Sequence, residues 1–125
     1  MTSVAIVTDS TAYLPKALLA EYNIHVIPNI VIWSGQSLRD GVDIEAVQFF
    51  ERLKVDPVHP TTSVASLGDM KAIYAQAAAR ADVVVGVHVS AKLSNTYTVA
   101  QEACGLIGGK EFHIVDSQAA SMALG

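Results

Sequence analysis

The side chains of this sequence that could do chemistry are hydroxyls and carboxylates gathered in four short polar stretches. Three of the stretches follow apolar runs typical of strands, and the fourth precedes a helical pattern. They are Thr8-Asp9-Ser10-Thr11, Ser90 to Ser94, Asp116-Ser117 and Thr61-Thr62-Ser63. Because the carboxyl ends of parallel strands meet at one edge of a sheet, where ligands bind, we expect these stretches to form a ring of neutral hydrogen-bond donors. Backbone N–H groups at helix starts near Ser66 and Ser94 would help such an edge hold an anion without a basic residue.

The same hydroxyls have an ordinary structural interpretation. Serine and threonine commonly cap helices and form turns, and for any single stretch this role is the more common one. We do not expect this structural role to account for all four stretches at once. Lys92 could neutralise a bound anion, but a lysine that faces solvent is the favoured interpretation.

Histidines offer a second kind of chemistry, because a base beside a serine can support nucleophilic catalysis. His25 and His113 lie in apolar strand-like runs, which is typical of packed core residues. His88 precedes Ser90 and is the histidine best placed to act at the edge of the sheet. The sequence has no G-x-S-x-G, G-x-G-x-x-G or P-loop motif.

Metal binding and cysteine chemistry have little support in the sequence. Asp9 and Asp116 could form a carboxylate pair for Mg²⁺, although aspartate after a strand commonly caps the next turn. The four histidines are scattered, and Cys104 is the single cysteine, which excludes a disulfide within the chain. Cys104 stands in an apolar helical pattern and is expected to be an inert core residue. We therefore predict no metal site.

The elements that must position these residues alternate along the chain. Short β-branched runs predict strands, and apolar residues spaced by three and four predict helices between them. The predicted strands are 4–7, 24–27, 30–33, 83–87 and 112–115, and the predicted helices are 15–22, 44–53, 66–77 and 94–107. Asp43 is expected to cap the second helix, and 57–63 is expected to be a loop. This order predicts an α/β fold, a doubly wound three-layer sandwich with a mainly parallel sheet.

Composition narrows the class of protein further. The chain has 125 residues, 51% of them hydrophobic and 16% charged, with a mean hydropathy of +0.37 and a formal net charge of −4. An acidic chain without a basic cluster is a poor nucleic-acid binder. No signal peptide and no membrane span are recognisable, so a cytoplasmic α/β domain is expected. The small-residue segment 119–125 stops within a helical pattern, which predicts that the chain is part of a larger protein or a truncated relative of one.

Four sequence blocks, in order, resemble the DegV family. They are VTDSTAYLP, HPTTSVAS, SAKLSNTYTVAQ and VDSQAASMALG, and the resemblance runs from Val4 to Gly125. It implies that residues 1–125 form the N-terminal α/β domain of a two-domain fold whose second domain is absent here. It also implies binding of a long-chain fatty acid, and in some members a role as the carrier subunit of fatty acid kinase.

The resemblance also assigns site residues, position by position. The hydroxyl of Thr62 with Ser63 beside it, and Ser94 with the backbone N–H of Asn95, would hold the fatty acid carboxylate. Asp9, Ser10, Asp116 and Ser117 would shape the same edge. The family usually carries a polar amide where Val64 stands, Pro where Ala65 stands, and glycine where Asn95 and Ala123 stand. Asparagine tolerates the positive φ that glycine allows, so Asn95 is a mild change.

The sequence therefore predicts a fatty-acid-binding protein that is not itself an enzyme, with no catalytic residue and no cofactor. A separate kinase subunit would convert the bound fatty acid into an acyl phosphate. The alternative is a small-molecule hydrolase or phosphotransferase that uses Asp9, Asp116 and His88. A third possibility is a scaffold or dimerisation unit that has lost binding.

Overall fold

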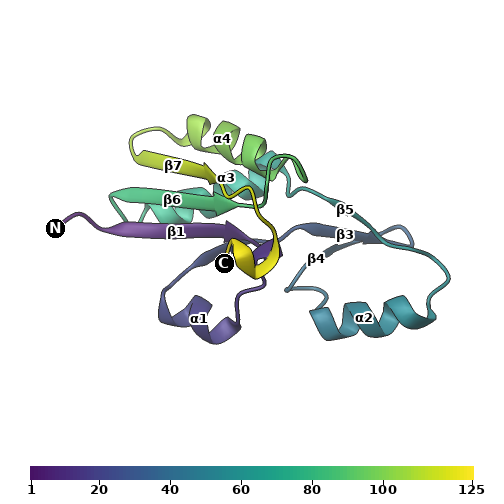
Figure 1. Cartoon of the computed structure of the whole chain (residues 1–125). Helices are drawn as coiled ribbons and strands as arrows, with labels where there is room; N and C mark the ends of the chain where they lie inside the picture. The colour runs from purple at the N-terminus through teal and green to yellow at the C-terminus, as the bar shows by residue number, and fades with distance from the viewer.

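The computed structural model describes residues 1–125 and contains two sheets (Figure 1). The larger sheet is parallel throughout, with the strand order β2-β1-β6-β7. Its strands are β1 (Val4–Asp9), β2 (His25–Ile27), β6 (Val83–His88) and β7 (Glu111–Asp116). The central strands β1 and β6 are runs of apolar β-branched residues, as expected of strands covered on both faces.

Helices flank the parallel sheet, and the predicted α/β class is confirmed. The helices are α1 (Lys16–Glu21), α3 (Leu67–Ala78) and α4 (Thr96–Ile107). α3 and α4 pack against each other and the sheet, and Figure 1 shows α1 on the opposite side. Ser66 caps α3, because its hydroxyl accepts a hydrogen bond from the Asp69 N–H at 3.1 Å. No helix is both long and apolar enough to cross a membrane.

A second, antiparallel sheet lies beside the first and was not predicted. Its order is β4-β3-β5, and its strands are β3 (Ile30–Trp33), β4 (Gln36–Arg39) and β5 (Thr61–Ser63). Ser34 and Gly35 both have positive φ and form the tight turn between β3 and β4. The predicted loop at 57–63 was thus wrong for residues 61–63. Thr62 pairs with Val31 in the structure. A polar strand of three residues at the edge of a sheet has no hydrophobic pattern that would reveal it in the sequence.

The helix of this second unit, α2 (Ala46–Val55), differs from its prediction in its cap and its buried face. Asp43 does not cap it, because both carboxylate oxygens of Asp43 accept hydrogen bonds from the Arg39 guanidinium at 2.9 Å. The N–H of Glu45 instead donates to Gln48 Oε1 at 2.9 Å.

The apolar stripe predicted for this helix is only partly buried. Val47 and Phe50 are 73% and 57% exposed, whereas Phe49 and Leu53 pack towards Val31, Trp33 and Ile44.

Two separate cores hold the fold. The larger contains 11 buried residues, among them Val7, Met70, Tyr74, Val84 and Cys104, between the parallel sheet and the helices α3 and α4. The smaller contains only three and lies between the antiparallel sheet and α2. Two short 3₁₀ turns complete the chain, η1 (Ser10–Ala12) and η2 (Ser121–Ala123), the second in the segment expected to begin a helix.

Candidate functional site

A cavity of about 500 Å³, here called the main cavity, lies where the two units meet. Its walls come from η1 and the residue that follows it, from β3 and β5, from α2 and from the segment between β6 and α4. The lining residues are Thr11, Tyr13, Asn29, Val31, Asp40, Ala46, Phe49, Phe50, Thr62, Ser63, Val64, Val89, Leu93, Ser94 and Asn95. One wall of the main cavity is therefore polar, and the aromatic side chains of α2 contribute to an apolar one.

The four residues predicted to hold a carboxylate all line the main cavity. Thr62 and Ser63 come from β5, and Ser94 and Asn95 come from the segment that leads into α4. The antiparallel pairing of β5 with β3 carries Thr62 to this edge. The structure therefore brings together the hydroxyl pair of Thr62 and Ser63 and the polar pair of Ser94 and Asn95, which lie about thirty residues apart in the sequence.

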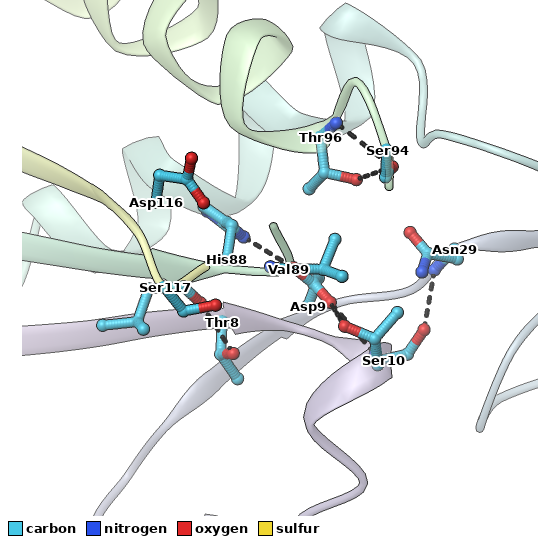
Figure 2. Close-up of polar contacts among 12 residues, drawn as sticks. Thr8, Asp9, Ser10, Asn29, His88, Val89, Ser94, Thr96, Asp116 and Ser117 are labelled. Carbon is cyan, nitrogen blue, oxygen red and sulfur yellow. Dashed lines mark hydrogen bonds and ion pairs between the residues drawn. The ribbon is translucent and has the colours of Figure 1, made fainter. Parts of the chain in front are cut away.

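Ser94 is held at the start of α4 by two contacts with Thr96. The Thr96 N–H donates to Ser94 Oγ at 3.3 Å, and the two hydroxyl oxygens lie 2.9 Å apart (Figure 2). When the Thr96 hydroxyl is the donor in this pair, the Ser94 proton is left for a ligand. Asn95 has a φ of −84°, so it does not use the left-handed conformation that would favour glycine there.

The hydroxyls of β5 are differently engaged. Ser63 Oγ donates to the carbonyl oxygen of Val64 at 3.2 Å, so its proton points to the backbone. Thr62 Oγ1 makes no hydrogen bond within the chain, and the residue is exposed. Of the two, Thr62 is the hydroxyl that is free to bind a ligand.

Behind the main cavity, a buried polar chain runs from Asp9 through His88 to Tyr74. His88 Nδ1 lies 2.9 Å from Asp9 Oδ2, and His88 Nε2 lies 2.5 Å from the Tyr74 hydroxyl. All three residues are 0% exposed. Asp9 also accepts hydrogen bonds from the Val89 N–H at 3.0 Å and from both the N–H and the hydroxyl of Thr11. Because Val89 and Thr11 line the main cavity, Asp9 fixes two of its walls from behind (Figure 2).

Electrostatics in this polar chain follow from burial and hydrogen bonding. Burial alone would raise the pKa of Asp9, but hydrogen bonds from His88, Thr11 and the Val89 N–H outweigh it and leave the pKa below its usual value. Burial raises the pKa of Tyr74, so its phenol stays protonated. Gly86 makes room for this phenol, because a Cβ at that position would lie 1.9 Å from the Tyr74 hydroxyl oxygen.

These contacts correct the expectation that His88 could act as a base at the edge. Its side chain is buried, both ring nitrogens have partners, and it does not line the main cavity. No group of three or more histidine, cysteine, aspartate or glutamate side chains lies close enough to hold a metal ion. Burial raises the pKa of the Cys104 thiol to about 12, in keeping with an inert core residue.

The four residues expected to shape the edge lie behind or beside the main cavity, and none of them lines it. Asp9 and Ser10 line a second cavity of about 480 Å³ that shares Tyr13, Asp40 and Ala46 with the main one.

Asp116 Oδ1 accepts from the Ala91 N–H at 3.1 Å and so ties the end of β7 to the segment before α4. Ser117 Oγ accepts from the Ala119 N–H at 3.2 Å, which is a local turn contact.

Sequence reasoning missed several lining residues that matter for charge and shape. No lysine, arginine or histidine lines the main cavity, and Lys92 is exposed away from it. Asp40 is its one ionisable carboxylate, and burial raises the pKa of this residue, helped by the charge of Glu45. Tyr13 adopts the left-handed conformation, with a φ of 50°. The adjacent aromatic residues Phe49 and Phe50 in α2 are the one sequence signal that could have pointed to this wall.

Comparison with known proteins places the chain among relatives that are longer than it is. The model of the DegV family of uncharacterised proteins matches residues 3–125. Protein DegV of Bacillus subtilis is 31% identical over 123 residues, which cover 98% of this chain and 44% of that protein. A DegV domain-containing protein of Deinococcus radiodurans is 37% identical over 123 residues, which cover 98% of this chain and 43% of the relative. The chain thus spans less than half the length of these relatives.

Solved structures give the same result. DegV of B. subtilis, described as a fatty acid binding protein, matches with a TM-score of 0.94 at 30% identity, covering 99% of this chain and 44% of that one. A Thermus thermophilus DegV family protein, described for its fatty acid binding, matches with a TM-score of 0.85 at 36% identity, covering 96% and 42%. A stearic acid-binding protein of Eubacterium ventriosum matches with a TM-score of 0.90 at 26% identity, covering 97% and 44%. With the family model and these relatives in agreement, the chain belongs to the DegV family.

Proposed function

We propose that this chain binds a long-chain fatty acid, with the carboxylate held in the main cavity by the hydroxyls of Thr62 and Ser94. The observation that carries the proposal is that hydroxyls from two distant segments, Thr62-Ser63 and Ser94, line one cavity between the units. Structural relatives described as fatty-acid-binding proteins support the choice of ligand. The part of these relatives that lies outside the span matched by this chain would supply the rest of the site.

The head group would be held by neutral donors rather than by a cation. Thr62 offers a hydroxyl without an internal partner, Ser94 offers a second, and Asn95 offers a backbone N–H at the start of the 12-residue helix α4. The helix N-terminus adds a partial positive charge next to the carboxylate. Ser63 would support the geometry of β5 rather than donate to the ligand, since its proton is used on the backbone.

The acyl chain would supply most of the affinity. Burial of each CH₂ contributes about 0.8 kcal/mol, so a chain of ~16 carbons that is half buried outweighs the contribution of a few polar contacts, about 1–3 kcal/mol. The apolar side chains available to it in the main cavity include Val31, Phe49, Phe50 and Leu93. Phe50 is 57% exposed, so its ring offers apolar surface that an acyl chain would cover.

We further propose that the bound carboxylate is presented to a separate kinase subunit, which converts it into an acyl phosphate. Thr62 and Ser63 are exposed, so a partner could reach the head-group end of the main cavity. Neutral hydroxyls hold an anion less tightly than a buried arginine pair, which suits a carrier whose ligand must leave a carboxylate oxygen free to attack the terminal phosphate of ATP, with ADP as the leaving group. The acyl phosphate would be detected by trapping it with hydroxylamine after the loaded chain is mixed with kinase and ATP.

The fatty-acid proposal is tested by loading the purified chain with hexadecanoic acid, extracting the lipid and measuring it by mass spectrometry. A Thr62→Ala, Ser94→Ala double variant is expected to bind about 10–100-fold more weakly, because it loses two hydrogen bonds to a charged group. The matched control is Thr61→Ala, Thr98→Ala, which removes two hydroxyls from β5 and α4 that do not line the main cavity.

Equal retention of fatty acid by the site variant and the control would contradict the assignment of these hydroxyls. A parent chain that takes up no lipid would instead favour a scaffold or dimerisation unit.

A further inference from the structure

Asn29, between β2 and β3, is held at both ends of its backbone. Its N–H donates to Ser10 Oγ at 3.0 Å, and its carbonyl oxygen accepts from the Asp40 N–H at 2.8 Å. These two hydrogen bonds fix the backbone of Asn29, so the residue is held at the main cavity without any hydrogen bond made by its own side chain.

The side-chain amide of Asn29, by contrast, has no partner in the chain. Its Oδ1 is the one buried side-chain polar atom of the protein without a hydrogen bond. Buried polar atoms are almost always paired, and an unpaired one costs about as much as the hydrogen bond it lacks. An orphaned atom of this kind, in a chain that otherwise satisfies its buried side chains, requires an explanation.

The amide lies on the main cavity, together with Thr62 and Ser94. Figure 2 shows the Asn29 side chain pointing into the space between Ser94 and Ser10. No cationic side chain lines this cavity, and Asp40 adds a carboxylate to it. A carboxylate ligand here needs every neutral donor that the walls can offer, and the amide is the donor that no protein group uses.

We propose that Asn29 is a further head-group residue, whose side-chain Nδ2–H donates a hydrogen bond to a carboxylate oxygen of the bound fatty acid. This inference rests on the proposed fatty-acid binding. The Nδ2 group makes no hydrogen bond within the chain and, unlike Oδ1, is not a buried atom. Because Asn29 lines the main cavity, Nδ2 can donate to a ligand there without any rotation of the amide.

Two variants test the role of the amide. Asn29→Leu removes the donor at similar volume, and Asn29→Asp keeps the shape but replaces the donor with a second negative charge. Hexadecanoate binding, measured by calorimetry on the full chain, is expected to weaken about 10-fold for Asn29→Leu and further for Asn29→Asp. Hexadecan-1-ol, which lacks the carboxylate, is expected to bind the parent and Asn29→Leu within about twofold of each other.

A measurement of the ligand-free chain separates binding from packing. Asn29→Leu is expected to raise Tm without ligand, because it removes an unpaired buried polar atom, while it weakens hexadecanoate binding. A purely structural asparagine would give the opposite change in Tm.

The outcomes separate this inference from the proposed function. The inference is overturned if Asn29→Leu and Asn29→Asp bind hexadecanoate as the parent does while the Thr62→Ala, Ser94→Ala variant loses binding; the proposed function would then stand. It is also overturned if both Asn29 variants lose hexadecan-1-ol as strongly as hexadecanoate. A parent that binds no hexadecanoate would remove both.

Discussion

The two units of the chain are held together in different ways. The parallel sheet with α3 and α4 encloses 11 buried core residues, whereas the antiparallel sheet and α2 enclose three. α2 has no buried residue at all. Since buried apolar area is the main source of stability, the first unit is the anchor of the fold and the second is a lightly attached wall.

The polar contacts of the first unit are also more deeply buried than those of the second. The first unit buries the Asp9–His88–Tyr74 chain completely, with hydrogen bonds at every step. The second unit relies on exposed ion pairs such as Arg39 with Asp43, which water and salt weaken.

The candidate site takes Ser94 from the anchor and Thr62 from the wall. A ligand held by both would draw the units together, and its binding would then stabilise the fold.

The largest effect expected in the anchor follows from Asp9→Ala. The substitution leaves His88 Nδ1 and the Val89 N–H without their buried partner. Each buried donor left without its partner typically costs about 1–3 kcal/mol, so the loss of unfolding free energy should reach about 2–6 kcal/mol, which urea denaturation would measure. A loss below about 1 kcal/mol would show that the hydrogen bonds of the buried polar chain contribute little to the stability of the anchor.

The lowered pKa of Asp9 predicts that the anchor loses stability in acid. Although burial opposes it, hydrogen bonding holds the pKa of Asp9 below 3.8 in the folded chain. A depressed folded pKa adds stability that is present above the unfolded value and is lost as the pH falls towards the folded value. Unfolding free energy is therefore expected to fall more steeply below pH 3.8 in the parent than in Asp9→Asn. Parallel pH curves for the two proteins would show that Asp9 does not cause this loss.

A smaller effect is expected from Gly86→Ala, also in the anchor. The new Cβ would lie 1.9 Å from the Tyr74 hydroxyl oxygen and 2.9 Å from the ring carbon that bears it, so the buried ring must move away from His88. Overpacking of this kind costs about 1–3 kcal/mol.

Gly105→Ala is the matched control for this change. Nothing lies within 4 Å of its added Cβ in α4, so the gain in helix propensity should stabilise the chain by about 0.5–1 kcal/mol. If Gly86→Ala and Gly105→Ala changed the unfolding free energy in the same direction, Tyr74 would not fill the space above Gly86.

The sequence predicted the anchor well because its signals are local and periodic. Val83 to Val87 could only be a buried strand, and Met70, Tyr74 and Ala77 share one helix face as their spacing indicates. The wall was predicted poorly, because β4 and β5 are short, polar and stabilised by pairing rather than by their own patterns. Asp43 failed as a helix cap for a similar reason, since Arg39 competes for its carboxylate.

The candidate site shows the same division. The hydroxyls of Thr62 and Ser94 were singled out by type, and the resemblance to the DegV family proposed their role, but only the fold places them on one cavity. His88 illustrates the limit of sequence order, because its place before Ser90 did not indicate that its ring turns inward to Asp9 and Tyr74. Asn29 carries no motif, and its unpaired oxygen is visible only in three dimensions.

The last pair of substitutions compares the two units directly, with Tyr74→Phe in the anchor and Trp33→Phe in the wall. Each removes the polar atom of a fully buried aromatic side chain, and Trp33→Phe also removes part of the ring system and leaves a cavity. Tyr74→Phe removes the hydroxyl that contacts His88 Nε2 and leaves this nitrogen unpaired in the core. Trp33→Phe removes a hydrogen bond of 2.9 Å from Trp33 Nε1 to the carbonyl oxygen of Val58, an exposed residue that water can reach.

The two variants should differ in the cause and the place of the loss. Tyr74→Phe should lose about 1–3 kcal/mol of unfolding free energy through the unpaired His88 nitrogen, and Trp33→Phe about 1–3 kcal/mol, mostly through the cavity, because water can satisfy the Val58 carbonyl oxygen. Hydrogen exchange locates each loss: Trp33→Phe should speed exchange in β3 and β5 and leave β6 unchanged, while Tyr74→Phe should speed it in both sheets. If Trp33→Phe accelerated exchange in β6 as much as in β3, the wall would unfold only together with the anchor, and the two units would be one cooperative structure.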